Sequence, residues 1–200
     1  MSTPSWDDLA ARNIAASARD LSGRLHVVGD TDTGRVDDEF VFWPKATDRW
    51  WVERNGDVVY VSATAAEDVP VARIDGQMVY QRRYNRIRTG RKLTPDDLFG
   101  PRSMVVRRSR GSRPLRKPEL IDVDNRPSWA VTVDSPNGTQ HRLVFDDATG
   151  VIVDMSSPDY PANFLRLSHL REHTELPRAQ VTWEGPAIET RELNTIGMSW

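Results

Sequence analysis

The chain has 200 residues, of which 38% are hydrophobic and 28% are charged, and this length favours a single domain with a sizeable core. It contains no cysteine, which excludes disulfides, a thiol nucleophile and a cysteine-ligated metal site. No apolar run is long enough to cross a membrane, and the first twenty residues lack the basic and then apolar pattern of a secretory signal. We therefore expect a cytoplasmic protein.

The net charge of −2 conceals a strong asymmetry along the chain. Residues 82–118 hold 13 of the 27 basic residues and only two acidic ones, so this segment carries +11 and the remainder −13. A basic surface suits the phosphates of nucleic acid or lipid, but it can equally lie against the acidic body of the same chain. The segment has few of the aromatic residues used in base stacking, which favours self-neutralisation. The predicted basic patch comprises Arg82, Arg83, Arg107, Arg108 and Arg110.

Residues 5–20 have the pattern of an N-terminal helix. Ser5 can cap this helix, and Asp8 follows at capping-box spacing. Beyond Gly23 the apolar residues alternate with polar ones, which is typical of half-buried β-strands. The chain therefore begins with a helix and continues into a sheet.

Tight turns divide most of the remaining chain into antiparallel strands. Two-residue hairpin turns need positive φ, which Asn, Asp and Gly adopt most easily. A Gly-rich phosphate loop and a strand–helix alternation are both absent from the sequence, which argues against a doubly wound nucleotide-binding fold. About nine to eleven short strands are predicted. The turn signals are Asn55-Gly56, Asp75-Gly76, Asn137-Gly138 and DATG at 147–150, and strand-like runs also cover 164–176 and 179–186.

The basic segment contains one short helix signal. Thr94 can cap a helix, Pro95 suits its first position, and Gly100-Pro101 ends it. This helix would form either a lid over the sheet or a surface connector. In terms of domains, we predict one β-rich unit at 1–186 with the basic insertion at 82–118, followed by a C-terminal tail at 187–200.

Motifs for catalysis or metal binding are weak. The segment from His169 to His173 matches the H-x-x-E-H spacing of one metallopeptidase class, but its alternation fits a strand with surface histidines better. No elbow turn presents a nucleophilic serine, and the paired acids lie at turns and helix starts. We predict no catalytic residue, no metal site and no cofactor.

Aromatic and branched side chains gather instead on the predicted sheet. Trp129 and Val131 alternate on one strand, and Leu143 and Phe145 alternate on its hairpin partner, so one face is strongly apolar. This face either forms the core against the N-terminal helix or lines an apolar cleft for a ligand. The predicted ligand-binding residues are Phe42, Trp51, Trp129, Val131, Leu143, Phe145 and Val153.

The run HRLVFDDATGVIV at 141–153 and the closing VTWEGP at 181–186 follow this order of elements. Together they resemble the bacterial lipoprotein-carrier and lipid-binding superfamily (LolA-like and LppX-like proteins), which includes sensor domains that regulate anti-sigma factors. The resemblance covers about residues 7–186. It implies an α+β, mainly antiparallel fold: a strongly curved half-open β-barrel of about nine to eleven strands, with an N-terminal helix and a short lid helix around an apolar cavity. Family carriers are periplasmic or lipid-anchored, whereas this chain is expected to use the scaffold in the cytoplasm.

We therefore predict a non-catalytic binding module with an apolar cleft. The cleft would hold a lipid-like ligand or an apolar segment of a protein partner. Two alternatives stay open at this point: the Arg-rich segment 82–118 would bind nucleic acid or another partner, or an enzyme would occupy the cleft.

Overall fold

The computed structural model describes residues 2–31, 34–46, 49–65, 69–80, 95–109, 113–135 and 138–190. Within these ranges the α-helices are α1 (Trp6–Ala15) and α2 (Met104–Ser109), and the 3₁₀ helices are η1 (Ala16–Ala18), η2 (Pro95–Asp97) and η3 (Arg178–Val181). The strands are β1 (Asp20–Thr31), β2 (Gly34–Lys45), β3 (Arg49–Arg54), β4 (Asp57–Val61), β5 (Val71–Ile74), β6 (Gln77–Tyr80), β7 (Arg113–Pro114), β8 (Glu119–Val123), β9 (Arg126–Asp134), β10 (Gln140–Asp146), β11 (Ile152–Ser157), β12 (Tyr160–His173) and β13 (Ile188–Glu189).

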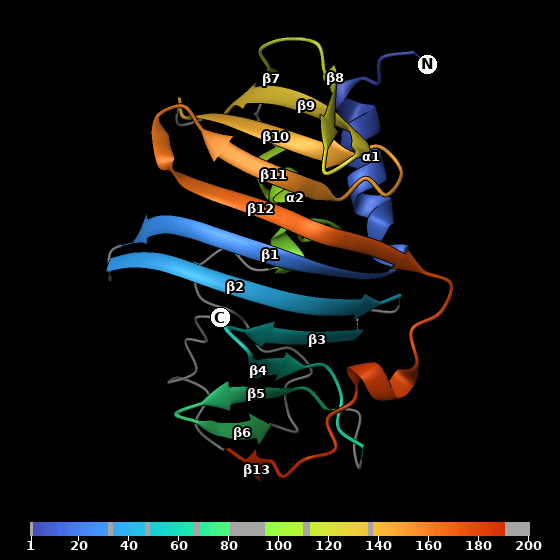
Figure 1. Ribbon diagram of the computed structural model, residues 1–200, viewed down its shortest axis with the longest axis vertical. Coiled ribbons are helices and arrows are strands. Elements are labelled where there is room, and N and C mark those ends of the chain that lie inside the picture. The colour runs from blue at the N-terminus through green and yellow to red at the C-terminus, as the bar shows by residue number, and fades with distance from the viewer. Residues whose placement is uncertain are drawn as a thin grey trace.

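The strands form one open sheet (Figure 1). Its hydrogen-bonded order is β13-β6-β5-β4-β3-β2-β1-β12-β11-β10-β9-β7, and β8 also pairs with β9. Among the described strands every pair is antiparallel except β13 with β6, which confirms the predicted mainly antiparallel α+β class. The described strands outnumber the predicted nine to eleven because β7 and β13, each two residues long, are too short to leave a sequence signal.

Two predicted hairpins are confirmed by their backbone geometry. Asn55-Gly56 joins β3 to β4 and Asp75-Gly76 joins β5 to β6, and φ is positive at all four residues. Such turns match the twist of the strands that they connect.

The other two predicted turns are those at 147–150 and at Asn137-Gly138. The 147–150 turn joins β10 to β11 as predicted, whereas Asn137 lies outside the described residues, although β9 and β10 pair as expected. A turn at Asp124-Asn125, which joins β8 to β9, was not predicted. Its φ values of 53° and 61° suit the two residue types, so the signal was present in the sequence.

The helices α1 and α2 lie on the same side of the sheet (Figure 1), here called the helical face; the opposite side is the outer face. Helix α1 starts with the predicted capping box, because the Ser5 hydroxyl accepts from Asp8 N at 3.1 Å and the Asp8 carboxylate accepts from Ser5 N at 2.9 Å. The α-helix ends at Ala15, and η1 continues it to Ala18, two residues before the predicted end.

The predicted helix that starts at Thr94 is not an α-helix. Thr94 lies outside the described residues, and η2 is a single 3₁₀ turn. Gly100 has a φ of 88° and donates its N–H to Asn13 O on α1, so the chain turns away at this point. The α-helix α2 follows the Gly100-Pro101 break, beyond the predicted end of the helix, because Met104 and Val105 bury their side chains in the core.

The predicted strand at 179–186 is also wrong. Residues Arg178–Val181 form η3, in which Gln180 N donates to Pro177 O at 3.0 Å, and Trp183 makes an isolated bridge to Thr64. Proline before the segment favours a turn rather than a ladder. The predicted boundary between the domain 1–186 and the tail 187–200 stays a prediction.

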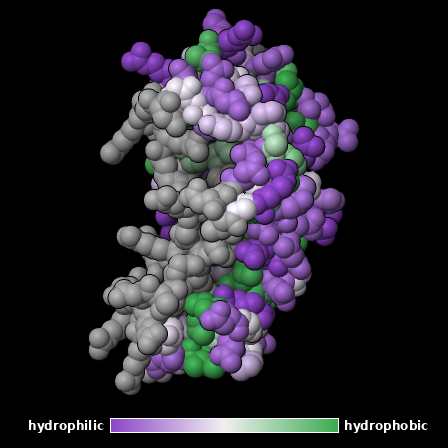
Figure 2. Space-filling model, turned by 90° about the vertical axis from the view of Figure 1, so that its left-hand side faces the viewer, coloured by the Kyte–Doolittle hydropathy of each residue, from purple (hydrophilic) through white to green (hydrophobic). Residues whose placement is uncertain are grey.

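Two clusters of buried apolar side chains lie on the sheet. The larger one joins the helical face to the helices, with Leu9, Leu98, Met104 and Phe145 each no more than 2% exposed. The smaller one consists of Val61, Val71 and Met78, with Trp51, Val58, Tyr80, Trp183 and Ala187 packed against it. The remainder of the outer face is mostly hydrophilic, on the right of Figure 2, and carries ion pairs that include Arg24–Glu39, His26–Asp37 and Arg166–Asp154.

We expect Gly150→Ala to destabilise the protein more than Gly76→Ala. Both glycines have positive φ, of 76° and 79°, so alanine at either costs about 1–2 kcal/mol of strain. A Cβ at 150 would also lie 2.7 Å from the Arg12 carbonyl oxygen of α1, whereas nothing lies within 4 Å of one at 76. Urea unfolding should show a loss of about 2–4 kcal/mol for Gly150→Ala and a smaller one for the control. Equal losses would contradict the packing of α1 on this turn.

Candidate functional site

Most of the predicted ligand-binding residues lie together, deep under the helices. Phe42, Trp129, Val131, Leu143, Phe145 and Val153 belong to the larger core cluster, and each is 5% exposed or less. Helices α1 and α2 contribute Leu9 and Val105 to the same cluster, and the loop between η2 and α2 contributes Phe99. Protein side chains therefore occupy the space next to these residues, and their role in holding a ligand stays a prediction.

Trp51 is the exception, because it lies on the outer face. It packs with Trp183 at a ring-centroid distance of 6.1 Å and donates its indole N–H to Glu53 at 3.0 Å. Its neighbour Trp50 points to the helical face instead, where its ring stacks on Phe99 at 5.4 Å with an interplanar angle of 22°. The sequence contained a signal for this choice, since Trp50 shares its face with Val52 whereas Trp51 shares its face with charged Glu53.

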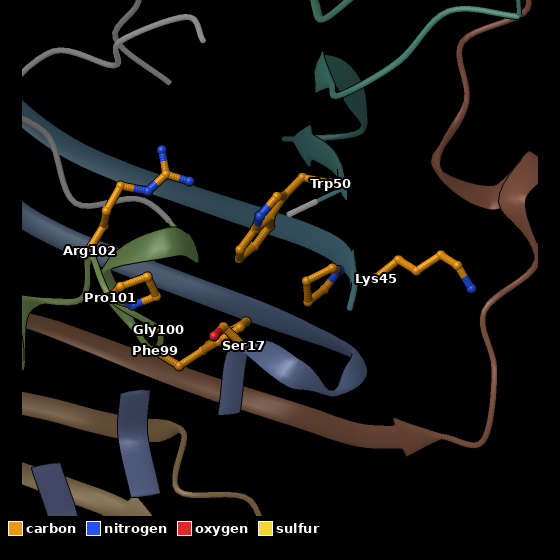
Figure 3. Close-up of a pocket in the computed structure, with 8 residues that line it drawn as sticks. Ser17, Lys45, Trp50, Phe99, Gly100, Pro101 and Arg102 are labelled. Atoms are coloured by element: carbon orange, nitrogen blue, oxygen red, sulfur yellow. The ribbon is translucent and has the colours of Figure 1, made fainter. Parts of the chain in front are cut away.

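A shallow pocket lies beside the Trp50–Phe99 pair, at the margin of the layer formed by the helices (Figure 3). It encloses about 20 Å³, which is room for a single water molecule. Lys45 extends away from it in Figure 3, so the walls are mainly aromatic rings, prolines and backbone. The lining residues are Ser17, Pro44, Lys45, Trp50, Phe99, Gly100, Pro101 and Arg102.

The pocket wall at 98–101 is held by a buried amide on α1. Asn13 is fully buried, and its Nδ2 donates to the carbonyl oxygens of Leu98 at 2.8 Å and Gly150 at 2.9 Å. Ile152 N donates to Leu98 O at 3.1 Å, which ties the same loop to the start of β11. These bonds fix the position of Phe99, and Phe99 in turn positions Trp50.

Next to the pocket, the carboxylate of Asp20 forms a clamp between separate segments of the chain. Its carboxylate accepts from Leu176 N at 2.6 Å and from Ala46 N at 2.7 Å, and it lies 3.4 Å from the Lys45 ammonium. Burial by itself would raise the pKa of the Asp20 carboxyl, but these hydrogen bonds and the Lys45 charge outweigh it, so the pKa lies below its usual value. The clamp joins the first strand to the segment that follows β12.

A second buried carboxylate, Asp146, holds the 147–150 turn. It makes a bidentate pair with Arg126, at 2.7 and 3.0 Å, and accepts from Thr149 Oγ1 at 2.6 Å. Burial opposes ionisation here too, but the bonds from Arg126 and Thr149 lower the pKa of Asp146. Asp20 and Asp146 are therefore engaged in holding the fold, and neither has the raised pKa of a general acid.

The remaining predicted sites are the basic patch and the H-x-x-E-H segment. Arg82, Arg83 and Arg110 lie outside the described residues, and only the α2 backbone is described at Arg107 and Arg108, so the basic patch stays a prediction. The H-x-x-E-H segment is part of strand β12, as its alternation predicted, and His173 forms a hydrogen bond with Ser22 at 2.8 Å.

The described ranges contain no group of three or more His, Cys, Asp or Glu that could hold a metal ion. None of the helices described is both long and apolar enough to span a lipid bilayer.

The chain resembles known proteins in its fold but not detectably in its sequence. No protein-family model matches the sequence, and no curated protein matches it significantly. Two solved structures of MucB share the fold. MucB in complex with MucA(peri) is 13% identical with a TM-score of 0.52, covering 88% of this chain and 59% of that chain. In the Pseudomonas aeruginosa MucA/MucB complex, the match is 14% identical with a TM-score of 0.52, covering 88% and 60%.

The predicted resemblance is confirmed at the level of the fold. A LolA superfamily protein from Nitrosomonas europaea also matches, over 91% of this chain and 98% of its own, at 8% identity and a TM-score of 0.34 that is too low to argue from. This chain spans about 60% of the length of the MucB chains that it matches.

We expect Asp20→Asn to remove a pH-dependent part of the stability. Because the pKa of Asp20 is lowered in the folded state, its contribution is present above the unfolded value near ~3.9 and is lost as the pH falls through the folded value. The variant should be about 1–3 kcal/mol less stable at neutral pH, and the difference should shrink below pH ~4. Urea unfolding across pH measures it, with exposed Asp57→Asn as the control. A loss of unfolding free energy that does not change with pH would contradict the role of the ionised Asp20 carboxylate in the clamp.

Proposed function

We propose that this protein is a non-catalytic binding module that holds an extended apolar segment of a protein partner on its helical face, with one side chain against the Trp50–Phe99 pocket. The observation that supports this choice is the position of the stacked aromatic pair at the edge of the helical layer. Trp50 is half-buried, whereas the aromatic residues under the helices are almost fully buried. Binding hot spots are enriched in tryptophan, whose ring becomes desolvated when the partner covers it.

The chemistry of the pocket wall suits a peptide side chain. Two prolines and two aromatic rings border it, and the 98–101 backbone is held rigidly by Asn13. A wall that is already ordered binds at a smaller entropy cost than a mobile loop. A residue such as leucine or proline on the partner would cover the exposed part of the Trp50 ring and displace water from it.

The close packing of the described core side chains favours a protein segment over a lipid-like ligand. Leu98 and Phe99 are 0% and 3% exposed and pack among the residues that an acyl chain would contact. A lipid would have to displace them, whereas a partner segment at the margin leaves the core intact. MucB, which has this fold, has been solved in complex with MucA(peri), and this supports partner binding as a use of the scaffold. A cytoplasmic location is part of this proposal.

We expect Trp50→Ala to weaken the binding of a selected peptide that Trp51→Ala leaves unchanged. A display library of extended peptides selected on the full chain supplies the probe. The two tryptophans are adjacent in sequence and lie on opposite faces, so they are matched in size and differ in side. Fluorescence titration should show an affinity loss of tenfold or more for Trp50→Ala, on the order expected for an aromatic anchor.

Native mass spectrometry of the purified chain serves as the second arm of this experiment. A bound lipid at one equivalent per chain would overturn the peptide proposal in favour of a carrier. Failure of every selected peptide to depend on Trp50 would also overturn it. Circular dichroism of both variants separates lost binding from lost folding.

A further inference from the structure

Among the strands that the structure describes, β8 forms an open edge at one end of the sheet. β8 pairs with β9 through the two-residue turn at Asp124-Asn125, and the register aligns Val123 with Arg126 and Ile121 with Ser128. Residues that flank a two-residue turn form a hydrogen-bonded pair, and such pairs recur at every second position. Glu119, Ile121 and Val123 therefore direct their backbone groups to β9.

The alternate residues of β8 direct their backbone groups the other way. The N–H and C=O of Leu120 and Asp122 point away from β9, into the space beyond the last strand. This end of the sheet lies at the opposite end of the long axis from β13 (Figure 1). Unpaired groups in a row form a template for a further strand.

An exposed apolar side chain lies at the middle of this edge. Leu120 is 51% exposed, and it shares a face with its cross-strand neighbour Trp129, which is 5% exposed. A strand added beside β8 would cover Leu120 and continue the apolar surface that Leu120 and Trp129 form together. Proline at 118 lacks an N–H and limits the open stretch to 119–123.

A basic block and an acidic block lie at the two ends of this edge, and the exposed Glu119 lies between them. Arg116 and Lys117 precede β8, whereas Asp122 and Asp124 lie at its far end, and all four side chains are exposed. Within the described part of the chain none of these four is in an ion pair. An antiparallel copy of the same segment would bring each basic block opposite an acidic block.

We propose that β8 pairs with β8 of a second copy of this chain, antiparallel, about a twofold axis at Leu120. In this register Leu120 exchanges two backbone hydrogen bonds with the partner copy's Leu120, and each Asp122 N–H donates to the Pro118 carbonyl of the other copy. Arg116 lies opposite Asp124 at both ends. The two sheets then join into one, and a twofold interface of this kind closes without further growth.

Sedimentation velocity of the full chain tests this pairing. The interface is small, so we expect the mean mass to rise from 22.7 kDa toward twice that value between about 1 and 200 µM. Leu120→Lys places two cations beside the axis and should weaken dimerisation at least tenfold. The matched control is Ile188→Lys, because Ile188 is 55% exposed at the opposite edge and should leave the dimer unchanged.

Hydrogen exchange identifies the edge directly. The amides of Leu120 and Asp122 should gain protection with rising concentration, whereas that of Ile121 should be protected at every concentration. A chain that stays monomeric throughout the range overturns the proposal. So does a dimer that Leu120→Lys leaves intact, or one formed without protection of Leu120 and Asp122. Added salt should weaken the dimer, since opposite charges meet at both ends.

Discussion

The buried amide of Asn13 joins three segments that lie far apart in the sequence. From the middle of α1 the side-chain Nδ2 donates to the carbonyl oxygens of Leu98 and Gly150, and the backbone carbonyl oxygen of the same residue accepts from Gly100 N. A buried carbonyl left without a donor costs about 1–3 kcal/mol, so one residue secures two loops. The helix, the loop before α2 and the turn after β10 are consequently placed together rather than independently.

The placement of those loops determines what the helical face can offer. Because the 98–101 loop is anchored, Phe99 enters the core and also stacks on Trp50. Because the 147–150 turn is anchored, Trp129 can donate its indole N–H to Asp147 at 2.7 Å while its ring stays in the core. Side chains of the described residues therefore pack closely under α1. The apolar surface that we propose for a partner lies at the margin, beside Trp50.

The two ends of the sheet are managed differently. At one end β13 closes β6 with a short parallel pairing, and Thr190 N extends it by donating to Tyr80 O at 2.9 Å. At the other end β8 has no strand beyond it among the described residues, and its protection consists of proline and charge. The basic and acidic blocks lie at opposite ends of β8. They therefore favour pairing with an antiparallel copy of the same strand over pairing with an unrelated strand. The proposed partner segment and the proposed second copy therefore use separate parts of the molecule.

Local rules accounted for much of the chain. The capping box at Ser5, the turns at Asn55-Gly56 and Asp75-Gly76, and the strand at His169–His173 depend on a few neighbouring residues, and the sequence alone was sufficient to predict them. It also determined that the fold would be mainly antiparallel, because short turns permit nothing else.

Tertiary contacts decided the remainder. The predicted ligand-binding set includes Trp51 on the apolar face, although the alternation of apolar and charged neighbours was a signal for Trp50 instead. The structure shows the choice directly, because Trp50 stacks on Phe99. The α-helix after Pro101 depends on burial of Met104 and Val105 by residues distant in sequence, which no local propensity encodes. The packing on the apolar face likewise depends on tertiary contacts, because side chains of α1 and of the 98–105 segment lie against it among the described residues.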